Sequence, residues 1–103
     1  MVKIKYYIMK LQLEKLKVKK SLTSDEVMEM EARKEIANGI YQQGTGGLAD
    51  AALAVKMWNG DDNTDYTEEE ADAILQFTAK HYVPAVIIAV QNLINAAKDG
   101  KKK

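Results

Sequence analysis

The chain has 103 residues, 47% of them hydrophobic and 29% charged, which suits one globular domain with a modest core. It contains no cysteine, so disulfides, cysteine-based zinc sites and thiol nucleophiles are excluded. The formal net charge is zero, yet residues 1–20 hold seven lysines and one glutamate, whereas residues 48–80 hold eight acidic residues and two lysines.

The N-terminal segment, residues 2–19, alternates apolar and polar side chains as strands do. Its first apolar residues fall on one side of an extended chain, at Val2, Ile4, Tyr6 and Ile8. The apolar phase then shifts twice, which predicts a turn or bulge near Met9-Lys10 and another near Glu14-Lys15. We therefore expect a small antiparallel strand pair or meander in this segment.

The next segment predicts a helix over residues 24–38. Thr23 and Glu26 have the spacing of a capping box, in which the threonine side chain and the glutamate side chain each bond the other residue's backbone N–H. Leu22 and Val27 stand where the two members of a hydrophobic staple would contact each other.

A glycine stop and a glycine-rich connector separate this helix from the next one. Gly39 is the expected C-terminal stop, and residues 42–47 predict a flexible connector. A second helix is predicted over residues 48–58. Because only Asp50 and Lys56 are charged in it, we expect this alanine-rich helix to be buried in the middle of the fold.

Two further helices follow an acidic loop over residues 61–66. Thr67 and Glu70 form a second capping box, which predicts a helix over residues 68–82. A proline then suits the first position of a fourth helix, over residues 84–97.

These elements predict an α+β fold, with short N-terminal antiparallel strands followed by a bundle of four helices. We expect one domain over residues 1–98, in which residues 2–19 form the strand segment and residues 23–98 form the helical core. Residues 99–103 are expected to be a disordered basic tail. The expected centre of the core is Leu53, Val55, Phe77, Val86, Val90 and Ile94.

The acidic loop can be aligned with the twelve-residue calcium loop of an EF-hand. The ligand positions would then be Asn59, Asp61, Asn63, Asp65 and Glu70. The template, however, has aspartate at the first position and glycine at the sixth, where this chain has Asn59 and Thr64. EF-hands also usually work in pairs, and the sequence has no second loop. We therefore interpret the segment as a solvated acidic loop before a capped helix, and we predict no metal site.

Other groups that could support chemistry also have simpler structural interpretations. His81 is the only histidine and lies on the apolar arc of the third helix, where packing accounts for it without a metal or catalytic role. The first-turn carboxylates suit helix capping and the helix dipole; they are Glu68, Glu69, Glu70 and Asp72. The stretch 44–47 lacks the lysine of a phosphate-binding loop. We predict no catalytic residue and no cofactor.

Trp58 and Tyr66 are the candidates for an interface, because aromatic residues are enriched in binding hot spots. Both would fit a local core equally well. The sequence leaves these two alternatives open.

The layout resembles that of small accessory proteins of phages and prophages, such as tail-assembly chaperones. The resemblance covers residues 11–97 and lies in the order of four segments. These are a lysine-rich strand segment, Leu11–Val18, the phrase Ile36-Ala-Asn-Gly-Ile-Tyr41, the alanine-rich helix Ala49–Gly60 and the phrase Thr67-Glu-Glu-Glu70. It implies a non-enzymatic assembly or accessory protein in the cytoplasm of a bacterial host.

We therefore expect a protein that binds a protein partner or a second copy of itself. The longest apolar run, residues 83–90, is too short to span a bilayer, so we expect no membrane partner. We expect no small-molecule substrate. The alternatives are an acidic-loop calcium-binding module and a small regulator that contacts nucleic acid through its lysine-rich ends. The uneven charge is also consistent with simple neutralisation within the molecule.

Overall fold

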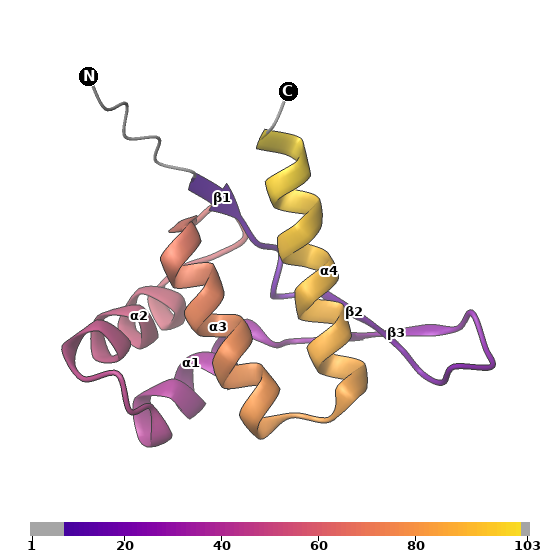
Figure 1. Cartoon of the computed structure of the whole chain (residues 1–103), viewed down its shortest axis with the longest axis horizontal. Coiled ribbons are helices and arrows are strands. Elements are labelled where there is room, and N and C mark those ends of the chain that lie inside the picture. Colours follow the sequence, from indigo (N-terminus) through magenta and orange to yellow (C-terminus); the bar gives the residue numbers. More distant parts are fainter. Residues whose placement is uncertain (1–7, 102–103) are drawn as a thin grey trace.

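Two short antiparallel sheets and four helices make up residues 8–101, the part of the chain that the computed structural model describes (Figure 1). This confirms the α+β class. The arrangement is only partly the predicted one, because one strand lies between the second and third helices and the helices do not form a single bundle.

The first sheet joins the N-terminal segment to the acidic loop. β1 (Ile8–Lys10) pairs antiparallel with β4 (Asp65–Thr67), and Met9 faces Tyr66 across the pair. Both of these side chains are buried, so this pair is part of the core. The predicted pairing with the residues that directly follow β1 is therefore wrong. Residues 2–7 of the predicted strand lie outside the described residues.

The second sheet is a β-hairpin that begins after a turn at Glu14-Lys15, and this turn confirms the second predicted change of phase. β2 (Leu16–Lys19) pairs antiparallel with β3 (Val27–Met30). Leu16 and Val18 are buried, and β2 packs against the last helix. The alternation of apolar and polar residues along β2 thus determines which of its sides faces the core.

The helix predicted over residues 24–38 is wrong in its first part, because β3 occupies that stretch and α1 (Arg33–Gln43) begins later. The capping box at Thr23 does not form, and the Glu26 N–H donates instead to the Ser24 Oγ, at 3.0 Å. Both staple residues are exposed. Pairing with β2 outweighs the local helix signal here, since strand formation depends on the neighbouring strand more than on intrinsic propensity.

Gly39 does not end α1, as the sequence predicts, but lies within it. A Cβ at this position would lie 2.8 Å from the ring of Phe77, so the glycine makes room for a side chain of the third helix. The helix ends at Gln43, and the N–H of the C-cap residue Gly44 donates to the Ile40 carbonyl at 2.8 Å.

α2 (Leu48–Asn59) has nearly the predicted bounds but not the predicted position. It is not buried in the middle of the fold: it packs mainly on α1, through Leu53, Ala54 and Met57. Val55, a predicted core residue, is 51% exposed. The sequence could not show that α2 has an apolar face that the other residues of the described range 8–101 leave exposed.

The last two helices agree best with the sequence. α3 (Glu68–His81) starts at the predicted capping box, and both hydrogen bonds of the box are present. α4 (Pro84–Lys101) starts at the proline and continues beyond residue 97. Of the other predicted core residues, Phe77 is only half-buried and four are buried, namely Leu53, Val86, Val90 and Ile94.

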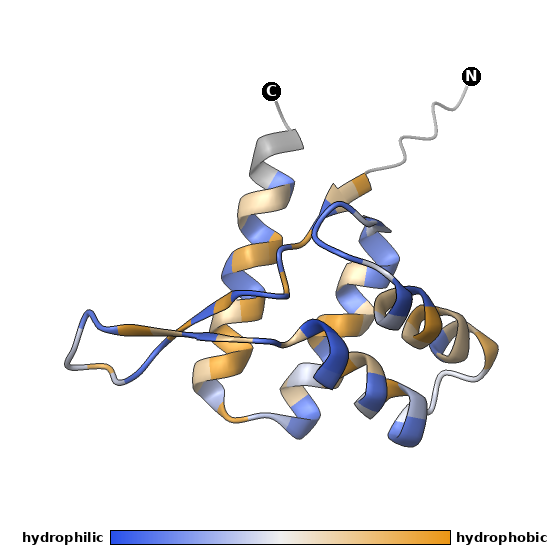
Figure 2. Cartoon of the chain, turned by 180° about the vertical axis from the view of Figure 1, so that it is seen from behind, coloured by the Kyte–Doolittle hydropathy of each residue, from blue (hydrophilic) through white to orange (hydrophobic). Residues whose placement is uncertain are grey.

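The helices pack as two pairs, α1 with α2 and α3 with α4, and α3 also contacts α1. In Figure 1, the α1–α2 pair lies on one side of the molecule and the β2–β3 hairpin projects from the other. Hydrophobic residues also occur along α2 and on the hairpin, where few other elements cover them (Figure 2). Among the helices of residues 8–101, none combines the length and the apolar composition that crossing a bilayer requires.

Candidate functional site

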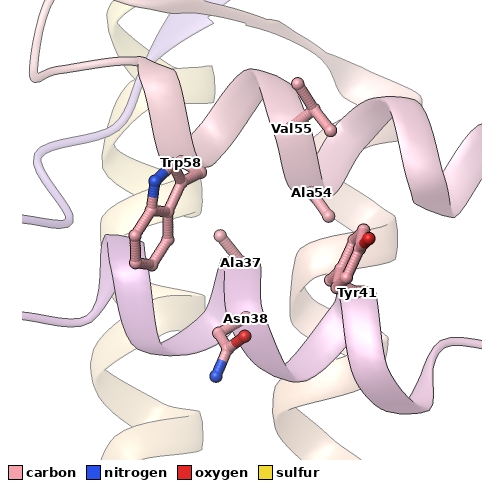
Figure 3. Close-up of a pocket in the computed structure, with 6 residues that line it drawn as sticks. All are labelled: Ala37, Asn38, Tyr41, Ala54, Val55 and Trp58. Atoms are coloured by element: carbon pink, nitrogen blue, oxygen red, sulfur yellow. The ribbon is translucent and has the colours of Figure 1, made fainter.

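A shallow apolar pocket of about 260 Å³ lies between α1 and α2 (Figure 3). Its walls come from both helices, and Asn38 is the one amide among its side chains. The six lining residues are Ala37, Asn38 and Tyr41 of α1 and Ala54, Val55 and Trp58 of α2. The two alanines are buried, and because they are small they leave a hollow between the larger side chains.

Trp58 and Tyr41 flank this pocket at opposite ends (Figure 3). Trp58 is 51% exposed and Tyr41 is 70% exposed, which are large values for aromatic side chains. Trp58 is one of the two interface candidates from the sequence, and the structure places its ring at the surface. Tyr41 is not among those candidates, because the sequence pattern only extends the apolar face of the first helix to this residue.

The pocket continues into an apolar stripe along the outer side of α2. Leu48, at its start, is 89% exposed. The stripe follows the helical spacing of three and four residues, at Leu48, Ala51, Ala52, Val55 and Trp58. All five residues are exposed, so α2 has one apolar face against α1 and a second one toward solvent.

A buried arginine fixes the end of α2 that bears the tryptophan. The Arg33 guanidinium donates to the Met57 carbonyl at 2.6 Å and to the Trp58 carbonyl at 3.1 Å. It also forms an ion pair with Glu14 at 2.6 Å. The Lys34 ammonium lies 5.3 Å from the centre of the Trp58 ring, within cation–π range. The backbone of Trp58 is therefore held while one side of its ring is open.

Tyr66, the second interface candidate, lies in the core and is fully buried. Burial raises its pKa to about 12, although the charge of Arg33 acts in the opposite direction. The Lys56 ammonium lies 5.2 Å from the centre of the Tyr66 ring. Tyr66 thus presents no surface to a partner in this structure.

Two acidic residues of the calcium-loop alignment, Glu70 and Asp65, pair with lysines of the protein. The Glu70 carboxylate accepts from Lys56 at 2.8 Å and from the Thr67 N–H at 2.9 Å. Burial alone would raise the pKa of Glu70, but these hydrogen bonds hold it below its usual range. Asp65 pairs with Lys10 at 2.6 Å. Over residues 8–101, no three His, Cys, Asp or Glu side chains converge on a point that could hold a metal ion.

The remaining candidates lie apart from the pocket or have structural partners. His81 is exposed, with its ring centre 4.3 Å from that of Phe77. Asp72 faces Lys98 at 3.7 Å. In the glycine-rich connector, the Gly46 N–H donates to the Asp50 carboxylate at 2.8 Å. An acidic side chain of the protein therefore occupies the position that a bound anion would need.

Comparison of the chain with protein-family models, with curated protein sequences and with solved structures gives no significant match.

Proposed function

We propose that this protein is a non-enzymatic binding or assembly protein, and that the outer face of α2 together with the pocket beside it receives an amphipathic helix of a protein partner. The observation that supports this most is the half-exposed Trp58, which stands beside an apolar pocket at the end of an exposed apolar stripe. Tryptophan in such a position is among the residues most enriched in binding hot spots.

The shape and chemistry of the surface favour a helix over a small molecule. The pocket of about 260 Å³ is smaller than the roughly 300–1,000 Å³ of typical small-molecule sites and suits one or two side chains. The stripe from Leu48 to Trp58 spans the length of α2, and helix-in-groove binding uses apolar residues at this spacing. A third helix laid beside α1 and α2 would cover the stripe.

The tryptophan itself provides the readout for a direct test, because Trp58 is the only tryptophan of the chain. Amphipathic helical peptides would be selected from a display library on the wild-type protein, with counter-selection against Val55→Asp. We expect the selected peptides to shift Trp58 emission to shorter wavelength, because binding removes water from the ring. We also expect Val55→Asp to weaken binding by about tenfold or more, since it places a charge in the apolar stripe.

Val83→Asp is the matched control, because Val83 is an exposed valine that does not line the pocket. It should bind the peptides like the wild type. Peptides that leave Trp58 emission unchanged, or that bind the two aspartate variants equally weakly, would contradict the proposed site. Light scattering of the protein alone would show whether a second copy covers the stripe instead.

A further inference from the structure

The two strands of the projecting hairpin carry opposite charges. β2 and the residues beside it supply Lys15, Lys17, Lys19 and Lys20, whereas β3 and its flanks supply Glu26, Glu29 and Glu31. All seven are exposed. None of them forms an ion pair with another residue of the described part of the chain. The hairpin therefore offers one basic edge and one acidic edge.

The register shows which backbone groups point away from the hairpin. The Lys20 N–H donates to the Glu26 carbonyl at 3.0 Å, so these two residues form a hydrogen-bonded pair. Along an antiparallel ladder, hydrogen-bonded pairs alternate with pairs that exchange no hydrogen bond. Lys17 stands opposite Glu29 and Lys19 opposite Val27, and neither pair exchanges backbone hydrogen bonds. The N–H and C=O groups of these four residues point outward, toward the free edges of β2 and β3. Within residues 8–101 each of the two strands has only one strand partner.

Two hollows lie along β2. A groove of about 560 Å³ lies between the hairpin and the start of α4, lined by Lys17, Lys19 and Lys20 and by the apolar Val27, Pro84 and Ile88. A second hollow, of about 290 Å³, continues along β2 between Lys15 and Leu93. Among the described residues, no acidic side chain lines either hollow.

We propose that β3 of a second copy of this chain adds antiparallel to the free edge of β2. With the register of the hairpin itself, Lys17 would face Glu29 of the second copy and Lys19 would face its Val27. Opposite charges directly across a strand pair stabilise it, and like charges destabilise it. The lysines therefore oppose pairing of two β2 edges and favour the edge of β3, which bears glutamates.

This contact uses two different edges, so each copy keeps one edge free after pairing. Such heterologous contacts continue into a ring or an open chain of copies. The hairpin edges and the outer face of α2 are separate surfaces, because the hairpin and α2 lie on opposite sides of the molecule (Figure 1).

Sedimentation velocity over a range of concentrations tests the proposal, with one variant for each edge. The first variant is Lys17→Glu/Lys19→Glu and the second is Glu26→Lys/Glu29→Lys. We expect the wild-type average mass to rise above the 11.5 kDa of one chain with concentration. Each variant alone should weaken association by about tenfold or more, since like charges then face each other. An equimolar mixture of the two variants should associate again, because each supplies the edge that complements the other.

Lys80→Glu is the control, since it reverses an exposed lysine of α3 away from the hairpin, and it should associate like the wild type. Circular dichroism of every variant would verify that the fold is retained. A monomer at all concentrations, or a mixture that stays monomeric although both variants are folded, would overturn the proposal.

Two further results would overturn the strand pairing and assign these surfaces to different contacts. Self-association that persists in about 1 M salt and is lost in Val55→Asp would assign the self-contact to the outer face of α2, because the short Debye length at that salt removes charge pairing. Binding of anionic vesicles or of single-stranded DNA that depends on Lys17 and Lys19, without self-association, would assign the basic edge to a membrane or a nucleic acid.

Discussion

At the scale of single residues, Arg33 joins three segments that are distant in sequence. It is the sole arginine of the chain, it is buried, and its guanidinium donates to Glu14, Met57 and Trp58. Its position inside the fold could not be predicted from the sequence, because burial of an arginine depends on acceptors that only the folded chain brings together.

We expect Arg33→Ala to lower the free energy of unfolding by about 2–4 kcal/mol, because it removes the buried guanidinium that donates to two carbonyls and to the partly exposed Glu14 carboxylate. Glu14→Gln should cost less than about 1 kcal/mol, since Glu14 is partly exposed and Arg33 keeps its hydrogen bonds to the two carbonyls. Urea denaturation would measure both variants. Equal losses for the two would show that the ion pair, and not the carbonyl bonds, stabilises this contact.

Tyr66 is a buried residue whose polar atom is unsatisfied in the described range 8–101. Among the described residues its hydroxyl has no hydrogen-bond partner. We expect Tyr66→Phe to be neutral or stabilising by up to about 1 kcal/mol, since it removes an unsatisfied polar group and keeps the ring. Chemical denaturation at neutral pH would measure this. A loss of more than about 1 kcal/mol would contradict the absence of a partner.

The same substitution should change the response to alkaline pH. Burial raises the pKa of Tyr66 from 10.0 to about 12, so the unfolded chain releases this proton first. The stability that the neutral phenol contributes is complete below pH 10 and is lost as the pH rises toward about 12. Tyr66→Phe should therefore lose less stability than the wild type across this interval.

At the scale of elements, the α3 capping box links stability to acid pH. Thr67→Ala should cost about 1 kcal/mol, because it removes the acceptor for the Glu70 N–H. The hydrogen bonds to Glu70 lower its pKa below the ordinary 4.5, so the unfolded chain binds this proton first as the pH falls. The stabilisation is present above pH 4.5 and is lost as the pH falls through the lowered value.

Glu70→Gln should therefore unfold at a lower temperature than the wild type at pH 7, and the two melting temperatures should converge as the pH falls below 4.5 through the lowered pKa of Glu70. Thermal melts over a series of pH values from neutral to acid would measure this. Glu69→Gln is the matched control, because Glu69 is exposed in the same helical turn but has no hydrogen bond to Lys56 or Thr67. If the melting temperatures of the two variants changed in the same way as the pH falls, the role assigned to Glu70 would be contradicted.

The two capping boxes also show how much of the fold the sequence could predict. The box at Thr67 is followed by apolar residues at helical spacing, and it starts α3 as predicted. The box at Thr23 has the same local chemistry, but the residues after it pair with β2 and form a strand. Local signals identify both segments as ordered elements, whereas only the neighbouring strand decides which of them is a helix.

The candidate site shows the same limit of sequence reasoning. Residue type alone identifies Trp58 as an interface candidate. The alanine-rich helix is apolar on nearly all sides, which predicts that the helix is buried. The structure shows that one of its two apolar faces packs on α1 and the other is exposed. The spacing of hydrophobic residues indicates that a helix has an apolar face, but the tertiary arrangement decides whether another element covers that face.

At the scale of the whole molecule, the outer face of α2, proposed to bind a helix, and the hairpin lie at opposite ends of a structure whose longest dimension is 50 Å (Figure 1). Sites that share no residues and lie far apart should act additively. A copy whose hairpin is joined to other copies could then still bind a helix through α2, so that an assembly would display one helix-binding surface per copy.

This independence can be tested with the emission of Trp58, which lies on α2 and away from the hairpin. We expect its emission maximum to stay constant when the protein is concentrated from monomer to assembly, and to shift only when a helical peptide is added. The peptide affinity of Lys17→Glu/Lys19→Glu should match that of the wild type within about twofold, because distant changes rarely couple by more than about 0.5 kcal/mol. An emission shift on concentration alone would place the self-contact at α2, and a loss of peptide affinity in the hairpin variant would show that the two ends of the molecule are coupled.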